Sequence, residues 1–387
     1  IVDDGQVVFE PAGPHWGMNC SAVQQSLRRT YGNDFQSAVI GPAGENLVRY
    51  ATVSHAGRHA GRGGSGAVLG SKNLKAILVR GTQRCSWAEP DKLVHIARRL
   101  SDKSLGPATA KYRELGTASN LLAFNRLNTL PTRNFQRSSF PGAERLAPES
   151  LVTSHGKTRS SCIACTIGCE HIYGTRDRSA DGALEVRVEY ENLFSLGSLC
   201  GIDDSRVVLK ASKMCDELGI DTISAGGTIA FAMECVARGL MDQPWLQFAD
   251  GDALLRAVNQ IAHRRGVGDL LAEGSRSLAH AMGGDALSFA PQVKGLELPG
   301  YEPRTMQTLA LGLAVGTRGA DHNRSGAAEV DFSDRSNRRQ LTSEAVQLAI
   351  ETEDKAALLD SLILCRFVRG AIGDFFAETS EMLRCVT

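Results

Sequence analysis

In the first part of the chain, apolar and polar residues alternate as they do in β-strands. One segment instead has its apolar residues at helical spacing. Residues Ile1 to Glu10 alternate around an Asp4-Gly5 turn, which predicts a β-hairpin. Apolar positions from Cys20 to Tyr31 recur at helical spacing and predict an amphipathic helix. Short apolar runs predict strands at Ser37–Ile40 and Ala76–Val79. This part of the chain is therefore expected to be rich in strands.

Helical periodicity begins near Ser86 and is expected to dominate as far as about residue 285. The spacing of Ser86 and Glu89 has the form of a capping box. Gly219 is a helix stop, and Asp221 is first of all expected to be the N-cap of the apolar helix that follows. The helices expected in the second half of this region are Val207–Leu218, Thr222–Met233, Asp252–Arg264 and Asp269–Met282.

These patterns predict an α+β fold that is mostly α. We expect a partial β-rich domain over residues 1–83, a helical domain over 84–290, and the incomplete start of a second helical domain over 291–387. A Pro/Gly-rich crossing at Lys294 to Arg304 marks the second boundary. The chain begins at Ile1, as if within a fold, and is expected to be part of a longer protein.

Composition narrows the function further. Lys plus Arg and Asp plus Glu both total 43, so the net charge is zero and a nucleic-acid partner is not expected. The sequence contains no run of about 18 apolar residues, so it predicts no membrane span. Ten cysteines in a chain of enzyme size, three of them clustered, fit a reducing cytoplasm better than a disulfide scaffold.

The cysteine cluster carries the strongest chemical signal. Cys162, Cys165 and Cys169 have the spacing C-x2-C-x3-C, which allows three thiolates to converge on one metal centre. Cys365, far downstream, is the best candidate for a fourth ligand. A triplet closed by one remote cysteine favours a [4Fe–4S] cluster over structural zinc, whose ligands usually come as two separated pairs. Zinc and ordinary buried cysteines remain alternatives.

A glycine-rich segment and a dense polar loop are further candidates for binding. Gly61, Gly63 and Gly66 match G-x-G-x-x-G, but no βαβ unit surrounds them, so we do not infer a dinucleotide fold. Bare backbone beside Arg58 and Arg62 suits an anion such as phosphate, and a flexible turn with solvated arginines is the alternative. The loop Gly316 to Ser325 is rich in charged side chains, as site loops often are.

Six blocks in collinear order resemble the aldehyde ferredoxin oxidoreductase family. They are IGPAGENLVRYA (40–51), AGRGGSGAVLGSKNLKAI (60–77), CIACTIGC (162–169), EYENLFSLGSLCGIDD (189–204), LGIDTISAGGTIAFAME (218–234) and DSLILCRF (360–367). The resemblance implies an oxidoreductase that converts aldehydes to carboxylic acids at a tungsten or molybdenum bis-pyranopterin, held at a domain interface. Electrons would leave through a [4Fe–4S] cluster to ferredoxin or a ferredoxin-like subunit, and a homodimer is a further expectation.

The resemblance also assigns roles to residues. Cys162, Cys165, Cys169 and Cys365 match the cluster ligands. Arg62, Gly63 and Gly64 match the loop that binds the pterin phosphate and magnesium. Asp221 and Asp360 match the two aspartates that bind the pterins, and Leu364 matches a leucine near the second of them. His322 and one glutamate of the pair Glu189 and Glu191 match the acid–base groups beside the metal, and the sequence does not decide between the two glutamates.

Two departures from the family pattern leave alternatives open. Ile363 stands where the family's D-x-x-G-L-C motif has glycine, so the second pterin contact is expected to be reshaped. Family members are also longer at both ends. A cluster-only electron-transfer or structural subunit that has lost the pterin is therefore an alternative, as is a relative acting on another substrate such as an aromatic thioester. A zinc-binding interaction module explains only one of the six blocks.

Overall fold

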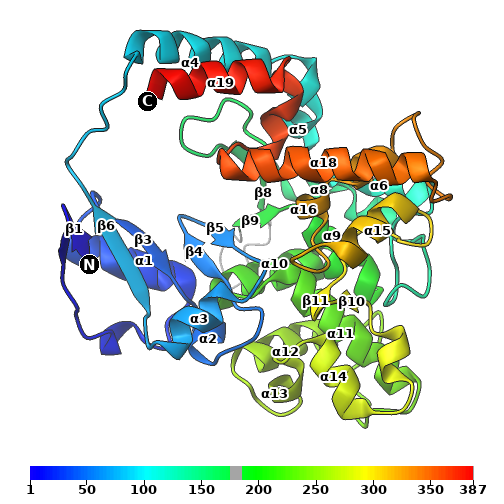
Figure 1. Ribbon diagram of the computed structural model, residues 1–387. Helices are drawn as coiled ribbons and strands as arrows, with labels where there is room; N and C mark the ends of the chain where they lie inside the picture. Colours follow the sequence, from blue (N-terminus) through cyan, green and yellow to red (C-terminus); the bar gives the residue numbers. More distant parts are fainter. Residues whose placement is uncertain (175–184, 387) are drawn as a thin grey trace.

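The computed structural model describes residues 1–174 and 185–386 (Figure 1). Its N-terminal part is a six-stranded sheet in the order β2-β1-β6-β3-β4-β5, in which β1 and β6 run parallel and the other neighbours antiparallel. The strands are β1 (Val2–Asp3), β2 (Gln6–Val7), β3 (Gln36–Val39), β4 (Val53–His55), β5 (Arg58–Ala60) and β6 (Ala76–Arg80). The fold is thus α+β with its larger sheet at the N-terminus, as the sequence predicted.

Helix α1 (Cys20–Tyr31) covers this sheet and begins and ends where its periodicity predicted. Its buried residues Cys20, Val23 and Leu27 pack with Val39 of β3 and Leu78 of β6 in a small separate core. The predicted hairpin is the β1–β2 pair, whose turn residues Asp4 and Gly5 both have positive φ. Three short helical elements complete this part: η1 (Gly13–His15), α2 (Pro42–Glu45) and α3 (Ser65–Ser71).

Helix α4 (Pro90–Ser104) lies apart from the sheet, beside the last helix α19 (Phe375–Val386) (Figure 1). The predicted capping box at its start is wrong. Glu89 is the N-cap residue, but no side chain caps the helix, and Pro90 occupies the first helical position instead. The elements that follow α4 are η2 (Pro107–Thr109), α5 (Ala110–Leu115), η3 (Thr117–Ser119), α6 (Asn120–Arg126), α7 (Ala143–Leu146) and α8 (Pro148–His155).

A second sheet interrupts the region that was expected to be mainly helical. It contains β7 (Lys157–Ser160), β8 (Glu170–Gly174) and β9 (Glu185–Val188), all antiparallel. Tyr173, Val186 and Val188 are buried, because alternate residues of these strands face the main core, and β9 packs against α10. Strands of four or five residues carry too few apolar positions for a reliable period, which is why the prediction missed them.

The main core surrounds helix α11 (Thr222–Ala237), which is buried over most of its length. Around it lie α9 (Tyr190–Ser195), η4 (Ser198–Cys200), α10 (Ser205–Leu218), α12 (Gly251–Ala262), α13 (Gly268–Leu271), α14 (Ser275–Met282) and η5 (Ala286–Phe289). Cys215 and Cys235 are buried core residues, as their apolar faces predicted. The single helix expected at 269–282 is two helices, because the chain turns between them at Gly274 with φ +85°.

The C-terminal elements pack mainly on one another. They are β10 (Gln292–Val293), β11 (Leu296–Glu297), α15 (Gln307–Val315), α16 (His322–Ser325), α17 (Ala328–Asp331), α18 (Ser343–Ser361), η6 (Arg366–Ala371) and α19. They reach the central helices through β11 and the N-terminal half of the chain through η6 and α19. Met306, Leu309, Leu313 and Ala320 form their own small core. No helix of the described residues has the length and apolar character that crossing a bilayer requires.

Candidate active site

A cavity of about 820 Å³ lies where the N-terminal sheet, the central helices and the C-terminal elements meet. Its walls come from β5 and the loop after it, the segment from α5 to α6, the start of α9, the start of α11, α16–α17 and η6. Four residues assigned from the sequence line it, namely Arg62, Glu189, Glu191 and His322. Segments separated by more than 300 residues therefore contribute to a single site.

Glu191 and His322 face each other in this cavity. Glu191 Oε1 lies 3.8 Å from His322 Nε2, and both side chains are largely buried. The other carboxylate oxygen, Oε2, accepts the Gly300 N–H at 3.0 Å. Glu191 Oε1 and His322 Nδ1 are buried and have no hydrogen-bond partner among the described residues. Such atoms are costly to bury, so their placement fits a role toward a bound molecule.

Glu189 has a different place in the structure. It is the N-cap of α9 and forms a reciprocal capping box with Asn192. Its carboxylate also accepts the hydroxyl of Thr117. These bonds tie Glu189 to the helix terminus, whereas Glu191, one half-turn further on, has an oxygen free to act in the cavity. The geometry therefore favours Glu191 over Glu189 as the acid–base group that the sequence left undecided.

Burial sets the protonation of the facing pair. Desolvation raises the pKa of Glu191 to about 7, and the Gly300 N–H and the charge of Arg62 only partly oppose it. Desolvation lowers the pKa of His322 to about 4, with Asp321 acting in the opposite direction and Arg62 and Arg366 adding to the decrease. At neutral pH His322 is therefore neutral, and Glu191 is close to half ionised. A carboxyl group with a pKa near the working pH suits proton transfer.

Arg62 and Asp221 form a buried connection at the edge of the cavity. Arg62 Nε lies 3.4 Å from Asp221 Oδ2, and both side chains are nearly inaccessible. The Arg62 guanidinium also donates to the carbonyls of Ala320 and Glu297, both at 2.6 Å. Asp221 caps α11 by accepting the N–H groups of Ile223 and Ser224, as predicted. This network joins three parts of the fold behind the cavity.

The two glycines after Arg62 allow backbone to approach backbone. Gly63 and Gly64 have φ of +104° and +73°, in the region that favours glycine. A Cβ at Gly64 would lie 2.2 Å from the carbonyl oxygen of Arg49, so no side chain fits. The Arg318 guanidinium lies over Gly63 and donates to the Arg62 carbonyl. The same guanidinium pairs with Asp321 at 3.0 Å. Bare backbone beside a guanidinium is chemically suited to hold a phosphate.

The four candidate cluster cysteines are all free thiols, and at least three of them lie near one another. Burial raises the pKa of Cys169 to about 11, and the charges of Cys365 and Cys162 also raise it, so both sulfurs lie within electrostatic reach. Within the described residues no three His, Cys, Asp or Glu side chains converge closely enough to hold a metal ion. Thiolates repel one another until a metal neutralises them, so full convergence is expected only with a cluster bound. The donor set itself, four thiols, fits a [4Fe–4S] cluster.

The motif that ends at Cys365 lies at the surface. Asp360 is half exposed and pairs with Arg324 at 3.4 Å, so the structure does not bring it to the cavity. Leu364 is partly buried and its N–H bonds the Leu359 carbonyl. Ile363 has φ +55° and is 93% exposed. A β-branched residue is disfavoured there, and this backbone geometry is the one that the family's glycine would adopt without strain.

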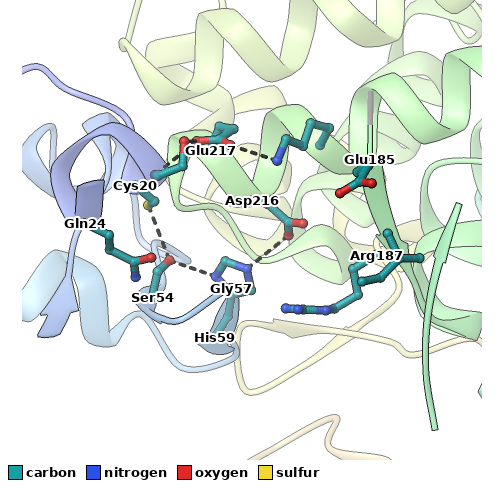
Figure 2. A pocket seen from close by; sticks show the side chains of 12 residues that line it. Cys20, Gln24, Ser54, Gly57, His59, Glu185, Arg187, Asp216 and Glu217 are labelled. Carbon is teal, nitrogen blue, oxygen red and sulfur yellow. Dashed lines mark hydrogen bonds and ion pairs between the residues drawn. The ribbon is translucent and has the colours of Figure 1, made fainter. Parts of the chain in front are cut away.

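A second, smaller cavity of about 210 Å³ lies between α1, the β4–β5 hairpin and α10 (Figure 2). Figure 2 shows a hydrogen-bonded chain in it, in which Ser54 Oγ lies 2.8 Å from His59 Nδ1 and 3.3 Å from Cys20 Sγ. His59 Nε2 lies 3.2 Å from Asp216 Oδ1. His59 lines both cavities. These contacts fasten the N-terminal sheet to α10 beside the larger cavity.

Several residues of the larger cavity were not predicted. Tyr301, Phe124 and Phe332 supply aromatic walls, and Arg366 supplies a guanidinium. Arg366 directly follows Cys365, so its position in the DSLILCRF block was a usable signal. The aromatic residues carried none, because a single aromatic residue in an apolar stretch is usually a core residue.

The fold and the site define a large α+β protein with an acid–base pair in a deep cavity beside a cysteine-rich loop. Comparison with protein families matches residues 1–81 to the N-terminal domain of aldehyde ferredoxin oxidoreductase and residues 95–387 to its domains 2 and 3. The chain therefore belongs to the aldehyde ferredoxin oxidoreductase family.

Characterised relatives include the tungsten-containing aldehyde ferredoxin oxidoreductases of Pyrococcus furiosus and Thermococcus kodakarensis. They are 35% and 34% identical over 96% of this chain, which spans 63% of the length of each relative. The WOR-like subunit of an aliphatic sulfonate oxidoreductase from Pyrococcus furiosus is 28% identical over 95% of this chain and 60% of its own length. The family thus contains oxidoreductases with different substrates.

A solved structure has the same fold. It is the active site complex BamBC of benzoyl coenzyme A reductase in complex with 1,5-dienoyl-CoA, with a TM-score of 0.75. The match covers 94% of this chain and 63% of that one at 20% sequence identity. At this identity the likeness establishes the architecture, and the chemistry of this chain has to be argued from its own residues.

Proposed function

We propose that this chain belongs to an enzyme that oxidises aldehydes to carboxylic acids at a tungsten or molybdenum bis-pyranopterin. The observation that carries the proposal is the pair Glu191 and His322, held 3.8 Å apart in the large cavity. The oxidation consumes an aldehyde and one water and releases the acid, two protons and two electrons. A site for it therefore needs a group that takes a proton and a route for electrons.

Glu191 is the proposed proton acceptor. Its Oε1 is the unpartnered oxygen, and a pKa of about 7 lets the carboxylate take a proton from water and release it again at neutral pH. His322 remains neutral and offers a ring nitrogen as a hydrogen-bond partner for the aldehyde oxygen or the water. The Gly300 N–H fixes the other oxygen of Glu191, so the acceptor keeps one orientation.

The cofactor contacts are proposed from the family resemblance. Arg62, Gly63 and Gly64 would hold pterin phosphate and a bridging magnesium, and Asp221 would accept N–H groups of one pterin ring. Asp360 and Leu364 match the second pterin contact, although Asp360 lies at the surface in this structure. The cluster ligands would be Cys162, Cys165, Cys169 and Cys365. When bound, the metal centre supplies two-electron oxidation and the cluster supplies one-electron transfer.

The partners follow from the same proposal. This chain spans less than two thirds of the length of its characterised relatives, so the electron acceptor and assembly belong to the whole protein. We propose ferredoxin or a ferredoxin-like subunit as the acceptor, and a homodimer as the assembly. A cytoplasmic location, favoured by the free cysteines, remains a prediction.

The cluster-only subunit is a second candidate, and one observation favours it. Asp360 and Ile363 of the second pterin motif lie exposed at the surface, away from the cavity. A protein that had lost its pterin would tolerate this arrangement, whereas it would still need its four cysteines.

Metal analysis of the anaerobically purified full-length protein, combined with an aldehyde-dependent viologen reduction assay, tests both candidates. About four irons with one tungsten or molybdenum, and aldehyde-dependent reduction, support the enzyme. The Glu191→Gln variant is then expected to keep its metals and lose more than about 100-fold in kcat. Iron without either heavy metal supports the cluster-only subunit. Zinc without iron contradicts both.

A further inference from the structure

Two cations of the cavity wall, Lys111 and Arg366, form no ion pair with the described residues. Arg62 has partners for all of its guanidinium nitrogens, and Arg369 Nη2 pairs with Glu329 Oε1 at 2.8 Å. Arg366, in η6, also lines the cavity but forms no ion pair within the described part of the chain. Lys111 already lies over the Tyr112 ring, 4.9 Å from its centroid, so Arg366 is the guanidinium that remains available to an anion.

Burial makes this charge costly. Arg366 Nη2 is inaccessible and has no hydrogen-bond partner among the described residues. The carboxylates of Asp360, Glu329 and Asp321 act on Arg366 only through space, since none of them forms an ion pair with it. A guanidinium that has lost water without gaining an acceptor is destabilising in the folded protein. A bound oxyanion would restore the missing bonds, ideally as a two-point contact with a carboxylate.

Arg366 shares a cavity with the acid–base pair. Its side chain, Glu191 and His322 all line the same space of about 820 Å³. A molecule of modest size could therefore place one end at His322 and Glu191 and the other at Arg366.

The walls near these groups are aromatic. Phe124 and Phe332 are stacked with centroids 5.1 Å apart, and the Tyr301 ring lies 5.1 Å from the His322 ring. Phe367, the neighbour of Arg366, packs on Tyr112 at 4.4 Å. Flat aromatic walls bind a flat ring through offset-stacked or edge-to-face contacts.

We propose that the substrate is an aromatic aldehyde that bears a carboxylate, which Arg366 binds while the aldehyde carbon lies at Glu191 and His322. This inference rests on the proposed aldehyde oxidation. The oxyanion at Arg366 has a second conceivable source, the phosphate of the pterin, and the experiment below separates the two.

The test compares 4-formylbenzoate with benzaldehyde on the holoenzyme and on the Arg366→Gln variant. The wild-type enzyme is expected to prefer 4-formylbenzoate by at least about tenfold in kcat/KM, because one charge-assisted bidentate contact has about that effect. Arg366→Gln is expected to lose about 10- to 100-fold with 4-formylbenzoate and less than about threefold with benzaldehyde. Arg366→Lys is expected to recover part of the loss. Arg339→Gln, which removes an exposed arginine outside the cavity, is the matched control.

Equal losses with the two aldehydes in Arg366→Gln would overturn the proposal. So would a loss of tungsten or molybdenum and pterin from this variant, because Arg366 would then serve the cofactor's phosphate. Calorimetric titration with terephthalate, the expected product, adds a reading that does not need turnover. If no aldehyde is oxidised but terephthalate binds to wild type and not to Arg366→Gln, the anion site stands and the proposed oxidation fails.

Discussion

Replacing Glu191 by glutamine should make the cofactor-free protein more stable at alkaline pH. In the folded chain burial raises the pKa of Glu191 from 4.5 to about 7. Between these two values the folded state keeps a proton that the unfolded state releases, so stability falls as the pH rises through this window. The full cost above pH 7 is roughly 3 kcal/mol. Glutamine carries no charge at any of these pH values and avoids the cost.

The assay is the free energy of unfolding in urea, measured for both proteins from pH 4 to pH 8. Wild type and Glu191→Gln should agree near pH 4 and diverge up to roughly 3 kcal/mol at pH 8, with the variant more stable. Glu189→Ala is the matched control two residues away. It removes the N-cap of α9, a loss that costs about 1 kcal/mol. Burial also raises the pKa of Glu189, so this cost should be largest at pH 4 and partly offset at pH 8.

A variant Glu191→Gln that is no more stable than wild type at pH 8 would refute the reasoning. Glu191 would then be ionised and well solvated or paired in the folded protein, and its proposed role as a proton acceptor poised near pH 7 would lose its physical basis. A gain in stability together with lost turnover would show instead that the buried Glu191 carboxylate destabilises the fold but is needed for catalysis.

Three further predictions concern the same site and its loops. If ionised Glu191 is the proton acceptor, kcat/KM should rise about tenfold from pH 6 to pH 8, and a flat profile would exclude this role. Gly64→Ala should lower the content of pterin and tungsten or molybdenum, because its Cβ would meet the Arg49 carbonyl, whereas Gly61→Ala, with open space around its Cβ, should retain both. Ile363→Gly should slow hydrogen exchange of the surrounding amides by an amount equivalent to about 0.5–1 kcal/mol, because glycine adopts φ +55° without strain. Ile163→Gly is the control, since Ile163 is about equally exposed but has no positive φ, and it should not slow exchange.

Much of the fold could be predicted from local pattern. Helix α1, α10 with its Gly219 stop and α11 with its Asp221 cap were all predicted closely. These elements have long amphipathic or apolar runs and explicit end signals, and such local features act the same way in any fold. The second sheet failed because its short strands are stabilised by pairing across the cysteine loop, a contact between residues distant in sequence.

The sequence by itself determined which chemical groups this protein carries. The four cysteines, the Arg62-Gly63-Gly64 loop and the candidates Glu189, Glu191 and His322 were all recognisable from spacing and resemblance. Only the tertiary structure decided how they are used. Glu189 caps a helix while Glu191 faces His322 across the cavity, because capping is local and burial is not. In the same way, Arg366 Nη2 lacks a partner only because the folded chain removes this nitrogen from water without providing an acceptor.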